Sequence, residues 1–284
     1  MSTTGVQTSV ATLPDLGILT RVLEAGTGAP VVFLHGSPDN ADEWLPVMAL
    51  LGDKFRCIAP DLPGYGEAPE PPRSFDYSIA SQVAFLDEFV RSLNLTEKPI
   101  LVVHDIGGVM GLAWAGADPS RIKALVVTNT VAFENFRWFG TARMWADTSF
   151  RGKLRAHIGM IAIGLNGGKL FKKLFGKQNP ALTPEQLDRF ATSFALNGAA
   201  KNSTIRQFRR MLAPGFFSGF APMIAALTAA VPSRVLWGEP DPYVGAEYAR
   251  QFGTATVTVL PGVGHWVPLM APQELAREIA LAAQ

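Results

Sequence analysis

The fold is decided by the stretch Ile100-Leu101-Val102-Val103-His104-Asp105-Ile106-Gly107-Gly108. Its first four residues are apolar, which predicts a central strand of a parallel sheet, buried on both faces. Gly107 and Gly108 provide the permissive backbone that a sharp turn needs, and residues 109–117 continue with a helical pattern. Strand, turn and helix in this order place Asp105 at the strand's carboxyl end. A helix N-cap is the alternative interpretation of Asp105, because aspartate is favoured there.

The pattern around this stretch predicts a mostly parallel sheet covered by helices on both faces, because short β-branched runs alternate with longer helical patterns. Between about residues 131 and 223 the strand pattern stops, and aromatic, helical sequence replaces it. We therefore expect a core domain of residues 1–130 and 224–284 with a helical cap of residues 131–223 above the sheet edge where ligands bind. Strands are predicted at 18–23, 31–34, 55–59, 100–103, 122–127, 235–237 and 255–260, and helices at 78–93, 109–117 and 273–283.

The composition of the 284 residues is that of a globular enzyme, with 48% hydrophobic and 17% charged residues and a net charge of +1. Basic residues are scattered, so no nucleic-acid partner is expected. The densest basic stretch, residues 169–177, is interpreted as a solvated helical face. The polar N-terminus does not resemble a signal peptide, and no apolar run is long enough to span a bilayer. We expect a cytoplasmic protein without a membrane partner, and the sequence indicates no oligomeric state.

Two further residues complete a catalytic pattern with Asp105. Asp241 follows the predicted strand that ends at Trp237, and His265 follows the last predicted strand in Gly264-His265-Trp266. Nucleophile, acid and histidine in this chain order, each after a strand, are typical of the α/β-hydrolase fold. His35-Gly36 follows an early strand, where that fold places its oxyanion loop.

A carboxylate at the nucleophile position predicts alkyl-ester chemistry. It is ionised at neutral pH and attacks an sp³ carbon that carries a leaving group, which forms an ester on Asp105. His265, oriented by Asp241, then activates the water that hydrolyses this ester. The backbone N–H groups of Ser37 and Ile106 are expected to hold the oxyanion of that step. Epoxides and alkyl halides suit this route.

These residues resemble the epoxide hydrolases of the α/β-hydrolase superfamily over nearly the whole chain outside the cap. The resemblance implies an eight-stranded, mostly parallel sheet with flanking helices and a cap. It also implies a small apolar substrate and neither cofactor nor metal. The motifs that carry it are His35-Gly36-Ser37-Pro38-Asp39 with Trp44, Ala59-Pro60-Asp61-Leu62-Pro63-Gly64-Tyr65-Gly66, Val103-His104-Asp105-Ile106-Gly107-Gly108 and Gly264-His265-Trp266.

The chain departs from this family in the cap. Epoxide hydrolases use cap tyrosines to bind and protonate the epoxide oxygen, whereas all four tyrosines here lie outside residues 131–223. The candidates for contacting the substrate and for donating that proton are Trp138, Trp145 and His157.

Two alternatives stay open. Haloalkane dehalogenases use the same aspartate mechanism, but they place tryptophan after the nucleophile and often asparagine after His-Gly, where this chain has Ile106 and Ser37. Haloacetate dehalogenases place arginine after the nucleophile. The other alternative is a non-catalytic α/β-hydrolase scaffold that binds a hydrophobic small molecule.

Overall fold

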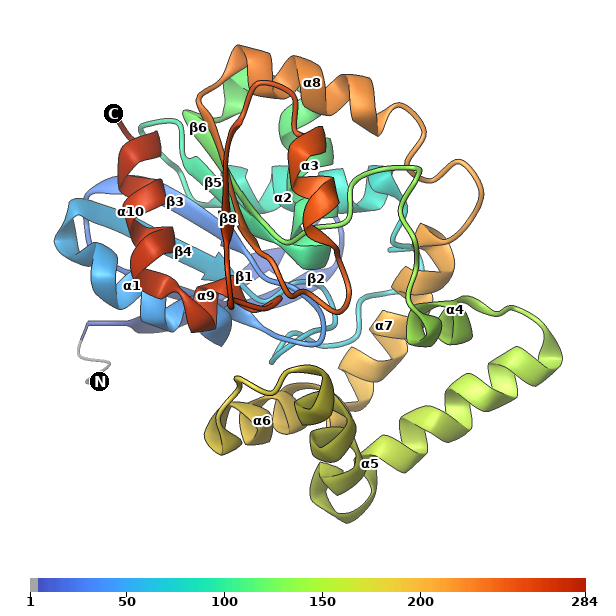
Figure 1. Cartoon of the computed structure of the whole chain (residues 1–284). Coiled ribbons are helices and arrows are strands. Elements are labelled where there is room, and N and C mark those ends of the chain that lie inside the picture. Colours follow the sequence, from blue (N-terminus) through green and yellow to red (C-terminus); the bar gives the residue numbers. More distant parts are fainter. Residues whose placement is uncertain (1–4) are drawn as a thin grey trace.

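A computed structural model describes residues 5–284 and shows an eight-stranded sheet with helices on both faces (Figure 1). The sheet order is β1-β2-β4-β3-β5-β6-β7-β8; β2 is antiparallel to β1 and β4, and the other neighbours are parallel. The mostly parallel, eight-stranded sheet expected from the sequence is confirmed. Its strands are β1 (Gln7–Leu13), β2 (Ile18–Ala25), β3 (Ala29–Leu34), β4 (Phe55–Pro60), β5 (Ile100–His104), β6 (Ala124–Thr128), β7 (Ser233–Gly238) and β8 (Thr256–Leu260).

Helices α1 and α10 cover one face of the sheet, and α2, α3 and α8 cover the other (Figure 1). The α-helices are α1 (Leu45–Leu51), α2 (Ile79–Ser92), α3 (Asp105–Ala117), α4 (Gly140–Ala146), α5 (Phe150–Gln178), α6 (Pro184–Phe190), α7 (Gly198–Met211), α8 (Phe220–Ala230), α9 (Val267–Met270) and α10 (Pro272–Ala282). Short helical turns are η1 (Ala41–Trp44), η2 (Gly52–Lys54), η3 (Pro119–Arg121), η4 (Ala191–Ala195, a π-turn) and η5 (Ala246–Gln251).

Strand β5 is buried on both faces, as its apolar run predicts. Leu101 and Val103 belong to the hydrophobic cluster on one side of the sheet, and Ile100 and Val102 belong to the cluster on the other. This alternation follows from the two-residue period of a strand. Burial on both faces holds β5 in place in the sheet, and α3 begins directly after it at Asp105.

Helix α2 begins at its predicted cap, since the Ser78 side chain accepts a hydrogen bond from the N–H of Ser81. Strand β1 is absent from the predicted strands, because residues 1–11 are interpreted there as a polar N-terminus. β1 lies at the sheet edge, and its residues from Gln7 to Thr12 are exposed or half-buried. An edge strand of this kind carries no alternating apolar pattern that would reveal it.

Helices α4 to α7, here called the inserted helices, lie between β6 and β7 in the sequence and over one end of the sheet (Figure 1). The Arg189 side chain of α6 makes a two-pronged ion pair with Asp39, at 2.5 and 2.8 Å, in the loop after β3. Helix α8 begins at Phe220, four residues before the expected domain boundary, and packs on α3. Within residues 5–284, none of the helices combines the length and apolar character needed to cross a bilayer.

Gly108 lets the first turn of α3 approach the loop after β6. A Cβ at this position would lie 1.9 Å from Oγ1 of Thr130. That hydroxyl cannot move aside freely, because it donates a hydrogen bond to the carbonyl oxygen of Asp105.

We therefore expect Gly108→Ala to lower the free energy of unfolding by about 1–3 kcal/mol, because overpacking forces a shift at this turn. Urea unfolding followed by circular dichroism measures the change. Gly140→Ala is the matched control, since a Cβ at Gly140 meets no atom within 4 Å. Equal stability of both variants would contradict the close approach.

Candidate active site

Asp105 occupies a strained turn between β5 and α3. Its φ of 46° lies in the left-handed region, which non-glycine residues rarely adopt. The turn is held from the loop after β6, because the Asp105 N–H donates to the carbonyl oxygen of Asn129 at 3.2 Å. This is the geometry by which a nucleophile elbow raises its side chain above the sheet. The interpretation of Asp105 as a simple helix cap does not require such a turn.

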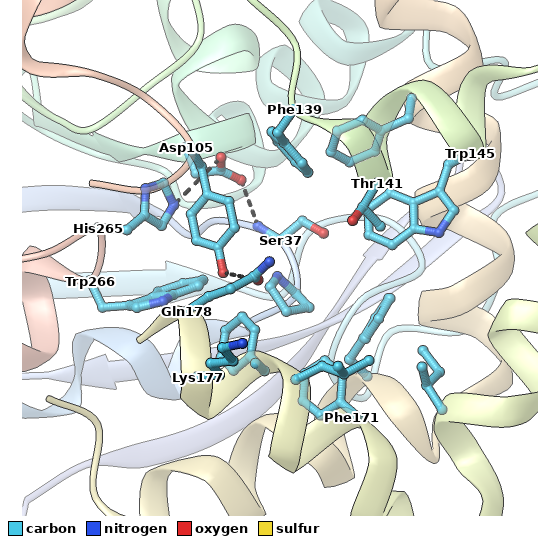
Figure 2. A pocket seen from close by; sticks show the side chains of 17 residues that line it. Ser37, Asp105, Phe139, Thr141, Trp145, Phe171, Lys177, Gln178, His265 and Trp266 are labelled. Atoms are coloured by element: carbon cyan, nitrogen blue, oxygen red, sulfur yellow. Dashed lines mark hydrogen bonds and ion pairs between the residues drawn. The ribbon is translucent and has the colours of Figure 1, made fainter. Parts of the chain in front are cut away.

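The Asp105 carboxylate lies between two groups that the sequence assigns to the same site (Figure 2). Oδ1 accepts a hydrogen bond from the N–H of Ser37 at 2.8 Å, and Oδ2 lies 3.7 Å from Nε2 of His265. Ile106 is the second residue of α3, so its N–H belongs to the open N-terminal end of the helix. The structure therefore brings the predicted nucleophile, base and oxyanion amides together.

Asp241 holds the other side of the His265 ring. Its Oδ2 lies 2.6 Å from Nδ1 of His265 and also accepts from the side-chain amide of Asn129 at 2.7 Å. Burial alone would raise the pKa of Asp241, but the charge of His265 and the hydrogen bonds outweigh it and lower that pKa. An ionised Asp241 orients the ring through Nδ1, which leaves Nε2 facing Asp105.

A second buried pair lies behind the nucleophile. Nδ1 of His104 is 2.8 Å from Oε1 of Glu43, within ion-pair distance, and both side chains are fully buried. Burial by itself lowers the pKa of His104, but the Glu43 carboxylate reverses this and raises it to about 9. Nε2 of His104 contacts the carbonyl oxygen of His265 at 3.1 Å, and Glu43 accepts from the N–H of Gly36. The pair thus connects three of the four loops that carry the site, those after β3, β5 and β8.

A pocket of about 560 Å³ opens above Asp105 and His265. Phe139, Trp145 and Phe171 are among its mostly apolar lining residues (Figure 2). This size and character suit a small apolar ligand.

The structure brings only one of the three predicted substrate-contact residues to this pocket. Trp145 lines it. The Trp138 ring instead packs against Phe136 and Phe208, outside the lining. His157 is exposed and borders a separate surface depression. His157 differs from the prediction because helical periodicity does not show which side of an inserted helix faces the sheet. Trp138 differs because it lies in the irregular segment before α4, whose path the sequence pattern does not show.

Tyr243 is a pocket residue that the sequence does not predict. It lies outside residues 131–223, yet its ring lines the pocket and lies edge-on to His265, 5.1 Å between centroids. Its hydroxyl donates to Oε1 of Gln178 at 3.0 Å and accepts from the amide of Asn179 at 2.8 Å. Loss of hydration raises the pKa of Tyr243. The only signal for it in the sequence is its spacing, two residues after Asp241.

We predict that Glu43→Gln removes a pH-dependent part of the stability. The folded-state pKa of His104, about 9, exceeds its ordinary value of 6.5, so the pair stabilises the folded protein fully below pH 6.5 and loses this effect as pH rises through 9. The free energy of unfolding should be higher for wild type than for the variant, and this difference should be larger at pH 6 than at pH 10 by up to about 3 kcal/mol. Urea titrations at both pH values test this, with the exposed Glu97→Gln as control. A difference independent of pH would contradict it.

Comparison with known proteins gives relatives of two named activities. The chain is 38% identical over 125 residues to a cis-3-alkyl-4-alkyloxetan-2-one decarboxylase of Xanthomonas campestris pv. campestris, covering 41% of this chain and 42% of that protein. It is 34% identical over 113 residues to a haloalkane dehalogenase of Agrobacterium fabrum, covering 40% and 36%. These matches therefore span less than half the length of either relative.

Among solved structures, the chain resembles the Cif epoxide hydrolase from Acinetobacter nosocomialis, with a TM-score of 0.80 and 18% identity over 100% of this chain and 91% of that one. At this identity the likeness concerns the fold. A family model described as the alpha/beta hydrolase fold matches residues 29–272, which include Asp105, Asp241 and His265. With most of its length covered by that model, the chain belongs to the α/β-hydrolase family.

Proposed function

We propose that this protein hydrolyses epoxides through a covalent ester on Asp105. One observation carries the proposal: the pocket holds both a carboxylate backed by a His–Asp pair and a phenol, that of Tyr243. Opening an epoxide needs a nucleophile and a proton for the ring oxygen, whereas a halide leaves without a proton. The phenol therefore favours the epoxide.

In the first step, a carboxylate oxygen of Asp105 attacks a ring carbon of the epoxide. The ring C–O bond breaks, its electron pair passes to the ring oxygen, and that oxygen takes the proton of the Tyr243 hydroxyl. Burial raises the pKa of Tyr243, so the phenol is fully protonated at neutral pH. The hydroxyl donates its hydrogen bond to Gln178, and rotation about the phenol C–O bond turns this proton to the substrate. The phenolate recovers a proton at the end of the cycle, when the Asp105 carboxylic acid formed in the second step ionises.

In the second step, Nε2 of His265 takes a proton from a water molecule that attacks the ester carbonyl carbon. The oxyanion is held by the N–H groups of Ser37 and Ile106. The intermediate collapses and expels the diol oxygen, which takes the proton back from His265 and leaves Asp105 as a carboxylic acid. That acid ionises, and its proton passes through solvent to the Tyr243 phenolate, which restores both groups. Asp241 stabilises the imidazolium throughout, because its buried carboxylate lies 2.6 Å from Nδ1.

We expect His265→Gln to trap the ester. Without the base, alkylation of Asp105 should proceed while hydrolysis slows by at least about a hundredfold. Intact-protein mass spectrometry after incubation with an apolar epoxide should show one added substrate mass, mapped by peptide analysis to Asp105. The variant carrying both His265→Gln and Asp105→Asn is the control. An adduct that persists in this control, or no adduct with any substrate while wild type is also inactive, would overturn the proposal.

Tyr243→Phe should slow alkylation by an epoxide about 10²–10⁴-fold, the usual range for loss of a general acid. In the His265→Gln background, the single-turnover rate of adduct formation measures this step alone. An alkyl halide of similar size serves as internal control, because its leaving group takes no proton. Equal slowing with both substrates would assign Tyr243 a structural role, and no slowing would remove it as the donor.

Opening of an oxetan-2-one is the second candidate, favoured by the 38% identity to the decarboxylase. If Asp105 attacks the ring sp³ carbon, the leaving group is a carboxylate, which is a far weaker base than an alkoxide. Tyr243→Phe should then leave the alkylation rate nearly unchanged. The same adduct assay with an epoxide, an alkyl halide and a dialkyl oxetan-2-one therefore distinguishes these substrates, and a non-catalytic scaffold would be labelled by none.

A further inference from the structure

The first half of α5 exposes an apolar stripe that no described residue covers. Phe150, Leu154, Ile158 and Ile161 are spaced by four, four and three residues, which places them on one face of the helix. Phe150 is 83% exposed, Ile158 is 55% and Ile161 is 51%. Figure 1 shows this part of α5, in yellow-green, along the outer edge of the molecule, away from the sheet.

The stripe is not the face by which α5 packs on the protein. That face consists of Gly152, Ala156 and Met160, which are buried. At 3.6 residues per turn, it lies on the opposite side of the helix from the exposed stripe. The helix is thus apolar on two opposite sides, and only one of them is needed for folding. A contiguous exposed apolar stripe of this kind marks an interaction surface.

The charge of α5 indicates what the stripe meets. Its 29 residues include seven lysines and arginines but no aspartate or glutamate, although the whole chain has a net charge of only +1. Arg151 and Arg155 flank the stripe on one side, and Lys153 flanks it on the other. Among the described residues, ion pairs link only two of these seven cations to carboxylates: Arg155 to Asp147 and Lys172 to Asp188. The surface is therefore apolar along its centre and cationic along its margins.

We propose that this face of α5 binds an anionic lipid surface. A helix lying in a bilayer interface buries its apolar side among the acyl chains while flanking lysines and arginines contact the headgroups. A second copy of the chain is a poorer fit, because a two-fold contact along the stripe would bring two cationic helices together. This inference goes beyond the proposed reaction and holds for any substrate.

The position of the pocket gives this surface a consequence. The second half of α5, after its kink at Leu165–Gly168, contributes Phe171, Leu174 and Gln178 to the wall of the pocket above Asp105. The helix that meets the lipid thus also borders the substrate site. Apolar substrates concentrate in bilayers, so docking by α5 places the pocket beside its supply.

Vesicle co-sedimentation of the full chain tests the proposal without any turnover, so its outcome is independent of the epoxide chemistry. The probes are vesicles of phosphatidylcholine alone and of phosphatidylcholine with about one third phosphatidylglycerol. Each lysine or arginine at an anionic surface is expected to raise the affinity about fivefold. Wild type should bind the anionic vesicles at least roughly tenfold more tightly than the neutral ones, and about 0.5 M salt should remove most of that difference. Equal binding to both vesicles, or binding to neither, would overturn the proposal.

Two variants separate the apolar and cationic parts of the surface. Phe150→Ser/Ile158→Ser and Arg151→Gln/Lys153→Gln should each weaken binding to anionic vesicles by roughly tenfold or more. All four side chains are exposed, so circular dichroism should show an unchanged fold. The matched control is Val10→Ser/Leu50→Ser, which alters two exposed apolar residues outside α5 and should leave binding unchanged.

The same samples exclude the other occupant. Analytical ultracentrifugation without vesicles should give the same molecular mass for wild type and for Phe150→Ser/Ile158→Ser. A dimer in wild type that becomes a monomer in this variant would assign the stripe to a second copy and overturn the lipid proposal. So would an equal loss of vesicle binding in the Val10→Ser/Leu50→Ser control.

Discussion

The site depends on the close approach of the loop after β3 to the turn at Asp105. A Cβ at Gly36 would lie 2.7 Å from the Cβ of Asp105, and one at Gly107 would lie 2.5 Å from the carbonyl oxygen of Leu34. Only glycine at both positions lets the two backbones come this near. Without that approach the N–H of Ser37 could not reach the Asp105 carboxylate, and Oδ1 would lose this hydrogen bond.

Two buried polar residues then tie the remaining loops to this turn. Glu43 accepts from the N–H of Gly36 and pairs with His104, whose other ring nitrogen contacts the backbone of His265. Asn129 accepts from the N–H groups of Asp105 and Gly238 and donates to Asp241. Because each is buried, losing any one contact leaves an unpaired polar group, so the loops are held as a unit.

The sequence predicts those site residues whose position is determined by the strand that precedes them. Asp105, Asp241 and His265 each follow an apolar run, and parallel strands bring their carboxyl ends to one edge, so their meeting is expected from the order of strands along the chain. The parts that depend on packing escape prediction. Strand β1 lacks an apolar pattern because it is an exposed edge. His157 lies elsewhere because the facing of an inserted helix is set by its neighbours, and Trp138 because it lies in the irregular segment before α4. Tyr243 is not predicted because no sequence pattern shows that a residue two places after Asp241 turns into the pocket.

Asp241 contacts both Tyr243, the proton donor of the proposed reaction, and His265, its base. The N–H of Tyr243 donates to Oδ1 of Asp241, while Oδ2 of the same carboxylate orients His265. The phenol and the imidazole are therefore set by one buried acid. The inserted helices contribute apolar walls, and the end of α5 contributes the two side-chain amides that bond the phenol, Gln178 and Asn179. Changes in those helices would accordingly alter both the apolar walls and the hydrogen-bond partners of the phenol, while the backbone of Tyr243 stays held by Asp241 in the loop after β7.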